Sequence, residues 1–139
     1  MRYIGIDYGT KLMGISISDE TNIVASGLCV IKYSEIKEVV QKIKEIITEY
    51  KISKIVLGFP LNMDGSLSKR CEEVLAFKDL LQNEIKIQVE LIDERLTSVI
   101  SNNILISNNT RRNKRKKVVD KVAATIILQS FLDRINYER

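Results

Sequence analysis

Short apolar runs separated by polar turns fill the first part of the chain. Residues 2–7 form a compact apolar run, and residues 13–18 alternate apolar with small polar side chains, as β-strands do. The polar cluster 19–22 predicts a turn, and residues 23–31 predict a third strand. Because strands joined by such short turns run antiparallel, this region predicts a three-stranded antiparallel meander.

Helical and strand-like patterns alternate in the middle of the chain. Ser34 is a typical N-cap residue, and the apolar positions that follow recur with the helical period as far as Tyr50. Residues 54–59 form a continuous apolar run, typical of a strand buried on both faces. A second helix is predicted over 68–82 and a fifth strand over 87–92. The inward face of that second helix is predicted to consist of Cys71, Val74, Leu75, Phe77 and Leu81.

The last part of the chain predicts two more helices, over 97–107 and 118–135. The order of elements therefore predicts an α/β fold, with a five-stranded mixed sheet of three antiparallel strands and then two parallel ones, flanked by helices. The sequence contains no repeat, no low-complexity linker and only one proline. Residues 1–139 are accordingly predicted to form a single domain.

Three carboxylates stand at positions where a carboxylate is unusual. Asp7 ends the first apolar strand, and Glu94 follows the fifth strand with Asp93 beside it. In α/β sheets, ligands gather at the carboxyl ends of the parallel strands, where both of these sites are predicted to lie. Asp120 stands at the start of the helix predicted over 118–135. The small residues Ala123 and Ala124 would let that helix press close to the sheet and bring Asp120 near Asp7.

Each acid also has a simpler explanation. Asp7 could organise a turn through its own backbone, although the nearby Gly9 would equally let a phosphate or metal ion approach closely. Side chains alternate along a strand, so only one of Asp93 and Glu94 can easily face the same site as Asp7. Spacing alone does not select between them. Asp120 could instead interact with the helix dipole.

The absence of histidine narrows the available chemistry. It excludes histidine-based acid–base catalysis, Ser–His–Asp nucleophiles and histidine zinc sites. Clustered carboxylates suit hard cations, so the predicted cofactor is Mg²⁺ or Mn²⁺, which could activate water for attack on a phosphodiester. Cys29 and Cys71 are predicted to be free thiols in a reducing compartment. No apolar stretch approaches a membrane span, so a cytoplasmic protein without membrane contact is expected.

Positive charge is concentrated in residues 111–117. The whole chain has a net charge of +4, and this segment alone holds six positive charges, so the remainder is net negative. Such concentration is typical of a polyanion-binding surface, although a solvated loop without a partner has the same composition. The candidate nucleic-acid contacts are Lys11, Asn62, Arg95, Arg111, Arg112, Lys114, Arg115, Lys116 and Lys117.

Four strings resemble the YqgF/RuvX family of bacterial proteins: GIDYGTK (5–11), VLGFPLNMDGS (56–66), DERLTS (93–98) and VVDKVAATIIL (118–128). The resemblance runs in order over nearly the whole chain and implies the ribonuclease H-like fold. It implies that Asp7, Glu94 and Asp120 are the metal-binding catalytic acids, and it selects Glu94 over Asp93. The chain departs from the family at 111–117, which has no glycine where relatives often have a Gly-containing, moderately basic loop.

The resemblance implies a cytoplasmic nuclease that processes the 5′ end of precursor small-subunit (pre-16S) ribosomal RNA. The expected partners are structured RNA, branched DNA and the ribosomal precursor particle, with the protein acting as a monomer or weak homodimer. Cleavage of four-way DNA junctions is the first alternative, and it requires a dimer because two symmetric strands must be cut. A non-catalytic nucleic-acid-binding module is the second. The Asp-x-Gly-Thr turn at Asp7 also resembles the phosphate loop of actin-like and sugar-kinase ATPases, but these need two related domains.

Overall fold

The computed structural model describes residues 1–93 and 112–137, with side chains described for 1–93 and 121–137. The helix predicted over 97–107 lies outside the described residues, as do Glu94, Arg95 and Arg111. None of the helices in the described part of the chain combines the length and the apolar character that a membrane span requires.

Five strands form one mixed sheet, in the order β3-β2-β1-β4-β5. Strands β1, β2 and β3 pair antiparallel, whereas β4 pairs parallel with β1 and with β5. The sheet predicted from the sequence, with three antiparallel strands followed by two parallel ones, is confirmed. The strands are β1 (Arg2–Asp7), β2 (Leu12–Ser18), β3 (Ala25–Lys32), β4 (Ile52–Phe59) and β5 (Gln88–Asp93).

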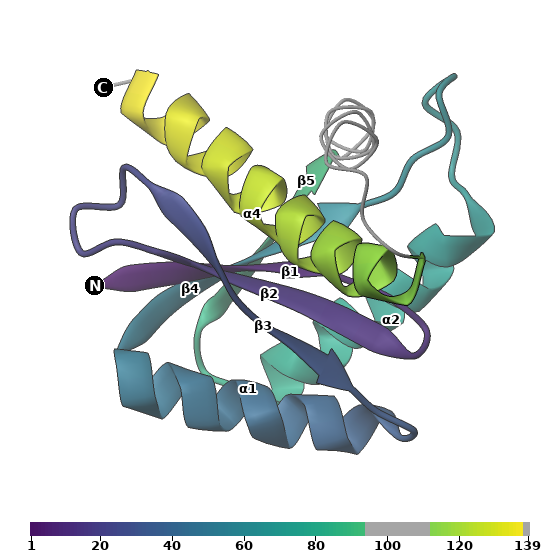
Figure 1. The fold of residues 1–139 in the computed structure, drawn as a ribbon, viewed down its shortest axis with the longest axis horizontal. Helices are drawn as coiled ribbons and strands as arrows, with labels where there is room; N and C mark the ends of the chain where they lie inside the picture. The colour runs from purple at the N-terminus through teal and green to yellow at the C-terminus, as the bar shows by residue number, and fades with distance from the viewer. Residues whose placement is uncertain (94–111, 138–139) are drawn as a thin grey trace.

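Helices cover both faces of this sheet (Figure 1). Helices α1 (Ile36–Tyr50) and α2 (Lys69–Glu84) lie on one face and enclose the larger hydrophobic core. Helix α4 (Arg112–Tyr137) crosses the other face over a smaller core, in which Phe131 is almost fully buried. The parallel strands β1, β4 and β5 are joined through α1 and α2, as parallel connections require.

Side chains of β1 alternate between the two cores. Ile4 and Ile6 belong to the core beneath α1 and α2, whereas the Tyr3 ring packs edge-on against Phe131 of α4, with ring centroids 6.1 Å apart. A Cβ atom on Gly5 would stand 2.7 Å from Leu128 Cβ, also on α4. By this alternation Asp7 belongs to the α4 face of the sheet.

Helix α4 presses unusually close to the sheet at Gly5. The Ser16 hydroxyl donates a hydrogen bond to the Ala124 carbonyl at 2.6 Å, which joins β2 directly to the helix backbone. A Cβ on Gly5 would stand only 2.9 Å from the same carbonyl oxygen. Ala124 is fully buried, so the prediction that a small residue brings this helix close to the sheet is confirmed at that position.

The start of α4 differs from the prediction. The helix begins at Arg112 rather than at residue 118, so residues 112–117 of the basic segment have helical backbone. Lysine and arginine are good helix formers, and a run of them can extend a helix that packing has nucleated further along. Asp120 is consequently the ninth residue of α4 and lies in its third turn instead of its first.

Two smaller predictions about helices α1 and α2 were also wrong. The N-cap of α1 is Glu35, because the Ser34 hydroxyl donates to the Glu38 carboxylate at 3.0 Å instead of capping a backbone N–H. Leu75 of α2 is 38% exposed, whereas the other residues predicted for its inward face are buried. It lies one position beyond the buried Val74, where the helical period turns the side chain outward.

The third strand begins at Ala25 because Asp19 holds the preceding residues in a turn. The Asp19 carboxylate accepts hydrogen bonds from the backbone N–H groups of Ile23 at 2.9 Å and Val24 at 3.1 Å. It also accepts the Thr21 hydroxyl proton at 2.5 Å. These three hydrogen bonds lower the pKa of Asp19 to about 2, and the bond from the Thr21 hydroxyl has the largest effect. Residues predicted to be strand at 23 and 24 are therefore exposed turn residues.

Replacing Asp19 by Asn is expected to lower the free energy of unfolding at pH 7. A carboxyl group whose pKa is lower in the folded state contributes stability above its unfolded pKa, near 4, and loses it as pH falls through the folded value. The difference between wild type and variant should therefore shrink from about pH 4 toward pH 2. Urea unfolding at several pH values measures it, with Glu20→Gln as the charge-matched control. An equal deficit at pH 2 and pH 7 would contradict this role.

Candidate active site

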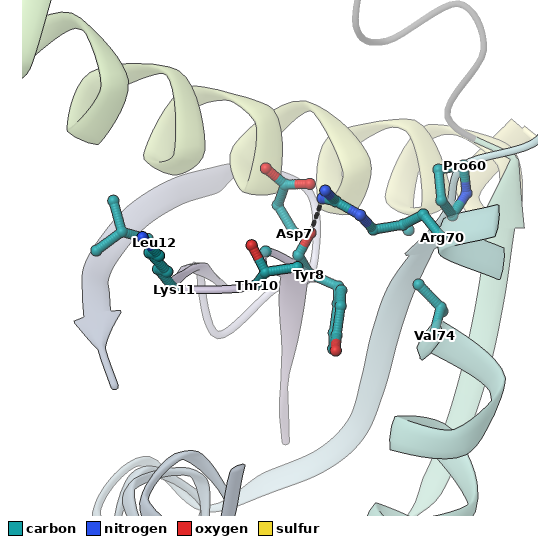
Figure 2. A pocket seen from close by; sticks show the side chains of 10 residues that line it. Asp7, Tyr8, Thr10, Lys11, Leu12, Pro60, Arg70 and Val74 are labelled. Carbon is teal, nitrogen blue, oxygen red and sulfur yellow. Dashed lines mark hydrogen bonds between the residues drawn. The ribbon is translucent and has the colours of Figure 1, made fainter. Parts of the chain in front are cut away.

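A cavity of about 220 Å³ lies where β1 and β4 end, beside the start of α2 (Figure 2). Because β1 and β4 are parallel, their carboxyl ends meet at the same edge of the sheet, which is where ligands bind in α/β folds. The residues around the cavity are mainly polar or glycine. They are Asp7, Tyr8, Gly9, Thr10, Lys11, Leu12, Gly58, Pro60, Arg70 and Val74.

Asp7 contributes the carboxylate of this cavity. It is the last residue of β1, pairs with Gly14 of β2 and is half-buried. Lys11 lines the same cavity from the following turn and is exposed. The structure therefore brings together two of the predicted site residues, one acid and one cation.

The turn after Asp7 is held tightly, which fixes the direction in which β1 ends. A side chain at Gly9 would collide with the Leu12 carbonyl, so packing alone requires glycine there. The Tyr33 hydroxyl donates to the Gly9 carbonyl, and the Tyr33 N–H donates to the Lys11 carbonyl at 3.1 Å. Close packing of this turn, rather than approach of a phosphate, accounts for Gly9.

Two tyrosines lie beside this turn and remain neutral at physiological pH. Burial raises the pKa of Tyr33 to about 12, with a further contribution from neighbouring Tyr8. Burial also raises the pKa of Tyr8, and the negative charge of Glu73 acts in the same direction. The Tyr8 ring packs against Phe77 of α2, with centroids 5.5 Å apart. The Tyr8 ring thus anchors the β1 end to α2, and both tyrosines stay uncharged.

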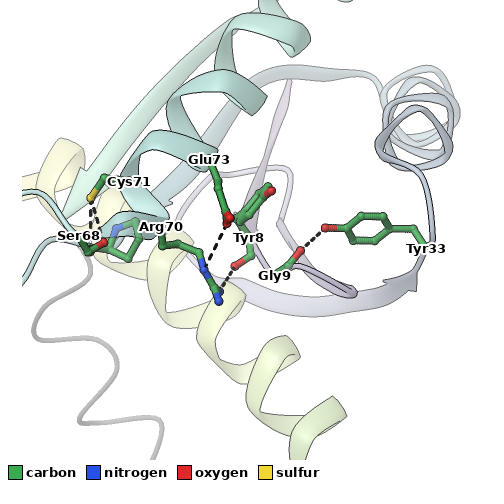
Figure 3. A network of polar contacts seen from close by, with 8 residues as sticks. Tyr8, Gly9, Tyr33, Ser68, Arg70, Cys71 and Glu73 are labelled. Carbon is green, nitrogen blue, oxygen red and sulfur yellow. Dashed lines mark hydrogen bonds and ion pairs between the residues drawn. The ribbon is translucent and has the colours of Figure 1, made fainter.

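Arg70 reaches the cavity from the first turn of α2, a position that the sequence reasoning missed. Its Nη1 donates to the Tyr8 carbonyl at 3.4 Å, and its Nε lies 3.7 Å from Glu73 Oε2 (Figure 3). A signal was present in the sequence, because Lys69 and Arg70 place two cations at a helix start, where the dipole disfavours them. Only the folded structure shows that Arg70 shares a cavity with Asp7.

Asn62 belongs to a closed loop beside the site and does not line the cavity. Its Nδ2 donates to Ser66 Oγ at 3.0 Å and to the Leu67 carbonyl at 3.4 Å. Gly65, with φ of 87°, takes the left-handed conformation that this tight turn needs. The Asn62 side chain therefore stabilises its own loop.

Strand β5 ends beside β4 with its last two side chains on opposite faces. Asp93 pairs with Phe59 of β4 and is exposed. Ile92 packs against the core beneath α4, whereas Leu91 packs against the core beneath α1 and α2. By alternation Asp93 belongs to the face opposite Asp7.

Residue 120 lies on α4 one helical turn before Ala124. The helix runs across β1 in the opposite direction, since Phe131 packs near Tyr3 and both Ala124 and Leu128 stand over Gly5. One further turn of helix advances about 6 Å, close to the two-residue step along β1 from Gly5 to Asp7. The backbone at residue 120 is thus directed toward the end of β1.

The described residues supply only part of a metal site. Among them, no three histidine, cysteine, aspartate or glutamate side chains gather closely enough to hold a metal ion. Of the three acids predicted to bind metal, only the side chain of Asp7 belongs to the described part.

Both cysteines are free, as predicted; Cys71 is buried and Cys29 half-buried.

The family model described as "RuvX: Holliday junction resolvase" matches residues 1–134. The chain belongs to this family. Curated relatives match over nearly their full lengths. One, from Clostridium tetani, is 42% identical over 135 residues, covering 97% of this chain and 98% of its own, and is named "Putative pre-16S rRNA nuclease". A relative from Bacillus pumilus carries the same name at 44% identity, covering 98% and 100%.

Solved structures of Holliday junction resolvases share the fold. RuvC of T. thermophilus, in complex with a Holliday junction substrate, aligns with a TM-score of 0.62 at 13% identity, covering 98% of this chain and 96% of its own. The Fowlpox virus resolvase, solved with Holliday junction DNA, aligns at 0.56 with 16% identity, covering 97% and 99%. The ribonuclease H-like fold predicted from the four sequence strings is confirmed.

Proposed function

We propose that this protein is a divalent-metal-dependent endonuclease that processes the 5′ end of pre-16S ribosomal RNA in the cytoplasm, within the ribosomal precursor particle. The observation that carries the proposal is the half-buried Asp7 in a polar cavity at the carboxyl ends of parallel strands. It occurs in a family whose curated relatives, about two-fifths identical over nearly the whole chain, are named as nucleases of this RNA.

Asp7, Glu94 and Asp120 are proposed to hold the metal. Carboxylate oxygens are the ligands that Mg²⁺ and Mn²⁺ prefer, and Asp7 presents one to an open cavity. When bound, such an ion can lower the pKa of a water and stabilise the leaving oxygen of a phosphodiester. In this proposal the protein's own part is to present these three carboxylates to the metal.

The positions of the neighbouring residues support this set of acids. Asp7 belongs to the α4 face, and Ile92 of β5 packs on that same face. By alternation along β5, Asp93 belongs to the opposite face, so it is not the acid proposed to act with Asp7. The antiparallel course of α4 over β1 supports Asp120 as the third acid. The face assigned to Asp93 is thus a physical reason against Asp93, and the choice of Glu94 rests on the family resemblance.

The basic segment, residues 111–117, is proposed to grip the nucleic-acid backbone independently of sequence. Replacing Lys116 and Lys117 by Gln should weaken binding to all substrates and reduce the slope of log affinity against log salt by about one for each phosphate that is no longer neutralised. Fluorescence anisotropy over a salt series measures this slope. Lys37 and Lys42, on α1 at the opposite face of the sheet, provide the matched control pair. An unchanged slope would remove the segment from the binding surface.

Cleavage of four-way DNA junctions is the second candidate, favoured by the family description and by the shared fold with junction resolvases. This activity would need two active sites in a homodimer, whereas RNA processing can be performed by a monomer. To test this, the protein is incubated with precursor RNA and a synthetic four-way junction that carry different labels. Cleavage of each is measured in one reaction with Mg²⁺ and in another with Mn²⁺. Preferential RNA cleavage supports the proposal; preferential junction cleavage by a dimer supports the alternative.

A non-catalytic binding module is the third candidate. It would bind both substrates and cleave neither, with or without metal. The same reactions, followed by a binding assay on the uncleaved substrate, separate it from the two nucleases. An Asp in the floor of a cavity meant only for phosphates would weaken binding by repulsion, which favours the catalytic proposals.

A further inference from the structure

Arg70 is a cation in the cavity that contains the proposed catalytic Asp7. We infer that the Arg70 guanidinium binds a backbone phosphate of the substrate beside the scissile bond. The inference deepens the proposed function and rests on it for the identity of the ligand. Three observations support the inference: the contacts that orient Arg70, the exposure of its side chain, and the unfavourable position of a cation in the first turn of a helix.

Two contacts position the guanidinium and leave most of its N–H donors available to a ligand. Nη1 donates to the Tyr8 carbonyl at 3.4 Å, and Nε faces Glu73 Oε2 at 3.7 Å. A guanidinium carries five N–H donors in a planar fork, and among the described residues only the contact to the Tyr8 carbonyl is a hydrogen bond. The side chain is 45% exposed, so a ligand in the cavity can reach it. Figure 2 shows it extending from α2 toward the end of β1.

The local contacts give Arg70 little stabilising role. A half-exposed ion pair at 3.7 Å, beyond hydrogen-bond distance, contributes little to folding. The first turn of a helix is also where the dipole disfavours a cation. Glu73 Oε2 is buried, and among the described residues it has no hydrogen-bond partner, so this carboxylate holds the guanidinium by charge alone. Arg70 is thus oriented at some cost to stability, as expected for a ligand-binding side chain.

Phosphate is the ligand that this arrangement fits best. Arginine's planar fork matches two oxygens of a phosphate, and it stays charged at every physiological pH. Asp7 lines the same cavity, so an anion held by Arg70 would lie next to the proposed metal-binding acid. Arg70 would then position the phosphate backbone beside Asp7, the acid proposed to bind the metal.

The test measures binding without cleavage. Affinity for a labelled RNA hairpin and a four-way junction is measured in EDTA over a salt series, for wild type, Arg70→Ala, Arg70→Lys and Lys69→Ala. Arg70→Ala should bind about tenfold more weakly, with a salt slope lower by about one. Arg70→Lys should keep the slope but lose several-fold in affinity, because lysine lacks the fork. Lys69, in the same turn but outside the cavity, should change affinity about twofold or less.

A purely structural Arg70 would give the opposite pattern. Arg70→Ala would then lower the melting temperature and leave affinity and salt slope unchanged, which would overturn the inference. If Arg70→Ala does not fold, Arg70→Lys decides, since wild-type affinity in that variant would also overturn it. Because the assay contains no divalent metal, it separates two failures. Weakened binding by Arg70→Ala with no cleavage by wild type would uphold the phosphate site and reject the nuclease.

Discussion

Replacing Asp7 by Asn is expected to reduce cleavage by about 10³-fold while nucleic-acid binding persists. Such a loss corresponds to about 4 kcal/mol of transition-state stabilisation. Asparagine keeps the size of the side chain and one oxygen, but it lacks the charge that a divalent cation needs. Asp7 is half-buried at the end of β1 and lines the cavity. Single-turnover cleavage with saturating enzyme measures the rate, and anisotropy in EDTA measures binding.

Asp93→Asn is the matched control for this prediction. Asp93 also ends a parallel strand of the same sheet edge, but by alternation it belongs to the opposite face. Its substitution should leave the cleavage rate within a few-fold of wild type. Equal losses in both variants would show that the acids act through general charge at this edge. A fully active Asp7→Asn would remove Asp7 from the chemistry.

Gly5→Ala is expected to destabilise the protein by about 1–3 kcal/mol or more, the usual cost of overfilling a core. The new Cβ would stand 2.6 Å from Ser16 Oγ, 2.7 Å from Leu128 Cβ and 2.9 Å from the Ala124 carbonyl oxygen. Two of these atoms belong to helix α4, one in its backbone, so relief requires the helix to move off the sheet. The variant should also lower cleavage, since it displaces the helix that carries Asp120. Urea unfolding measures the stability.

Gly27→Ala provides a control, because its new Cβ would make equally short contacts to a flexible side chain instead of to a helix backbone. A Cβ on Gly27 would stand 2.6 Å from Lys121 Cγ and 2.7 Å from its Cδ. These atoms belong to a flexible, exposed side chain that can turn away into solvent. The variant should cost less than half as much stability as Gly5→Ala. Similar losses in the two variants would mean that the closeness of α4 to the sheet is not what requires Gly5.

The sheet could be predicted because its signals are local. Alternation in 13–18 and the continuous apolar run at 54–59 reflect whether a strand is covered on one face or two. The turn at Asp19 was misjudged because side-chain hydrogen bonds to Ile23 and Val24 override their preference for strand. The start of α4 was misplaced because a dense run of charges was interpreted as a loop, although lysine and arginine favour helix.

The candidate site could be predicted only in part, for a different reason. Asp7 was identified from its place after a buried strand, and the structure gives it a cavity. Arg70 was missed because its contact with the Tyr8 carbonyl joins residues 62 positions apart, which no local pattern encodes. The face on which Asp93 lies could be assigned only once the structure placed Ile92 and Leu91 in different cores, and Glu94 stays a prediction.

The most direct test of the central claim is to map the product ends formed on precursor ribosomal RNA. Purified protein is incubated with an RNA that spans the 5′ end of 16S rRNA and its leader, in Mg²⁺ and in EDTA, and primer extension locates the new ends. We expect one defined 5′ end at the mature terminus, which forms only with Mg²⁺ and disappears in Asp7→Asn. RNA that stays intact in Mg²⁺ both when free and within the precursor particle, with binding to each preserved, would contradict it.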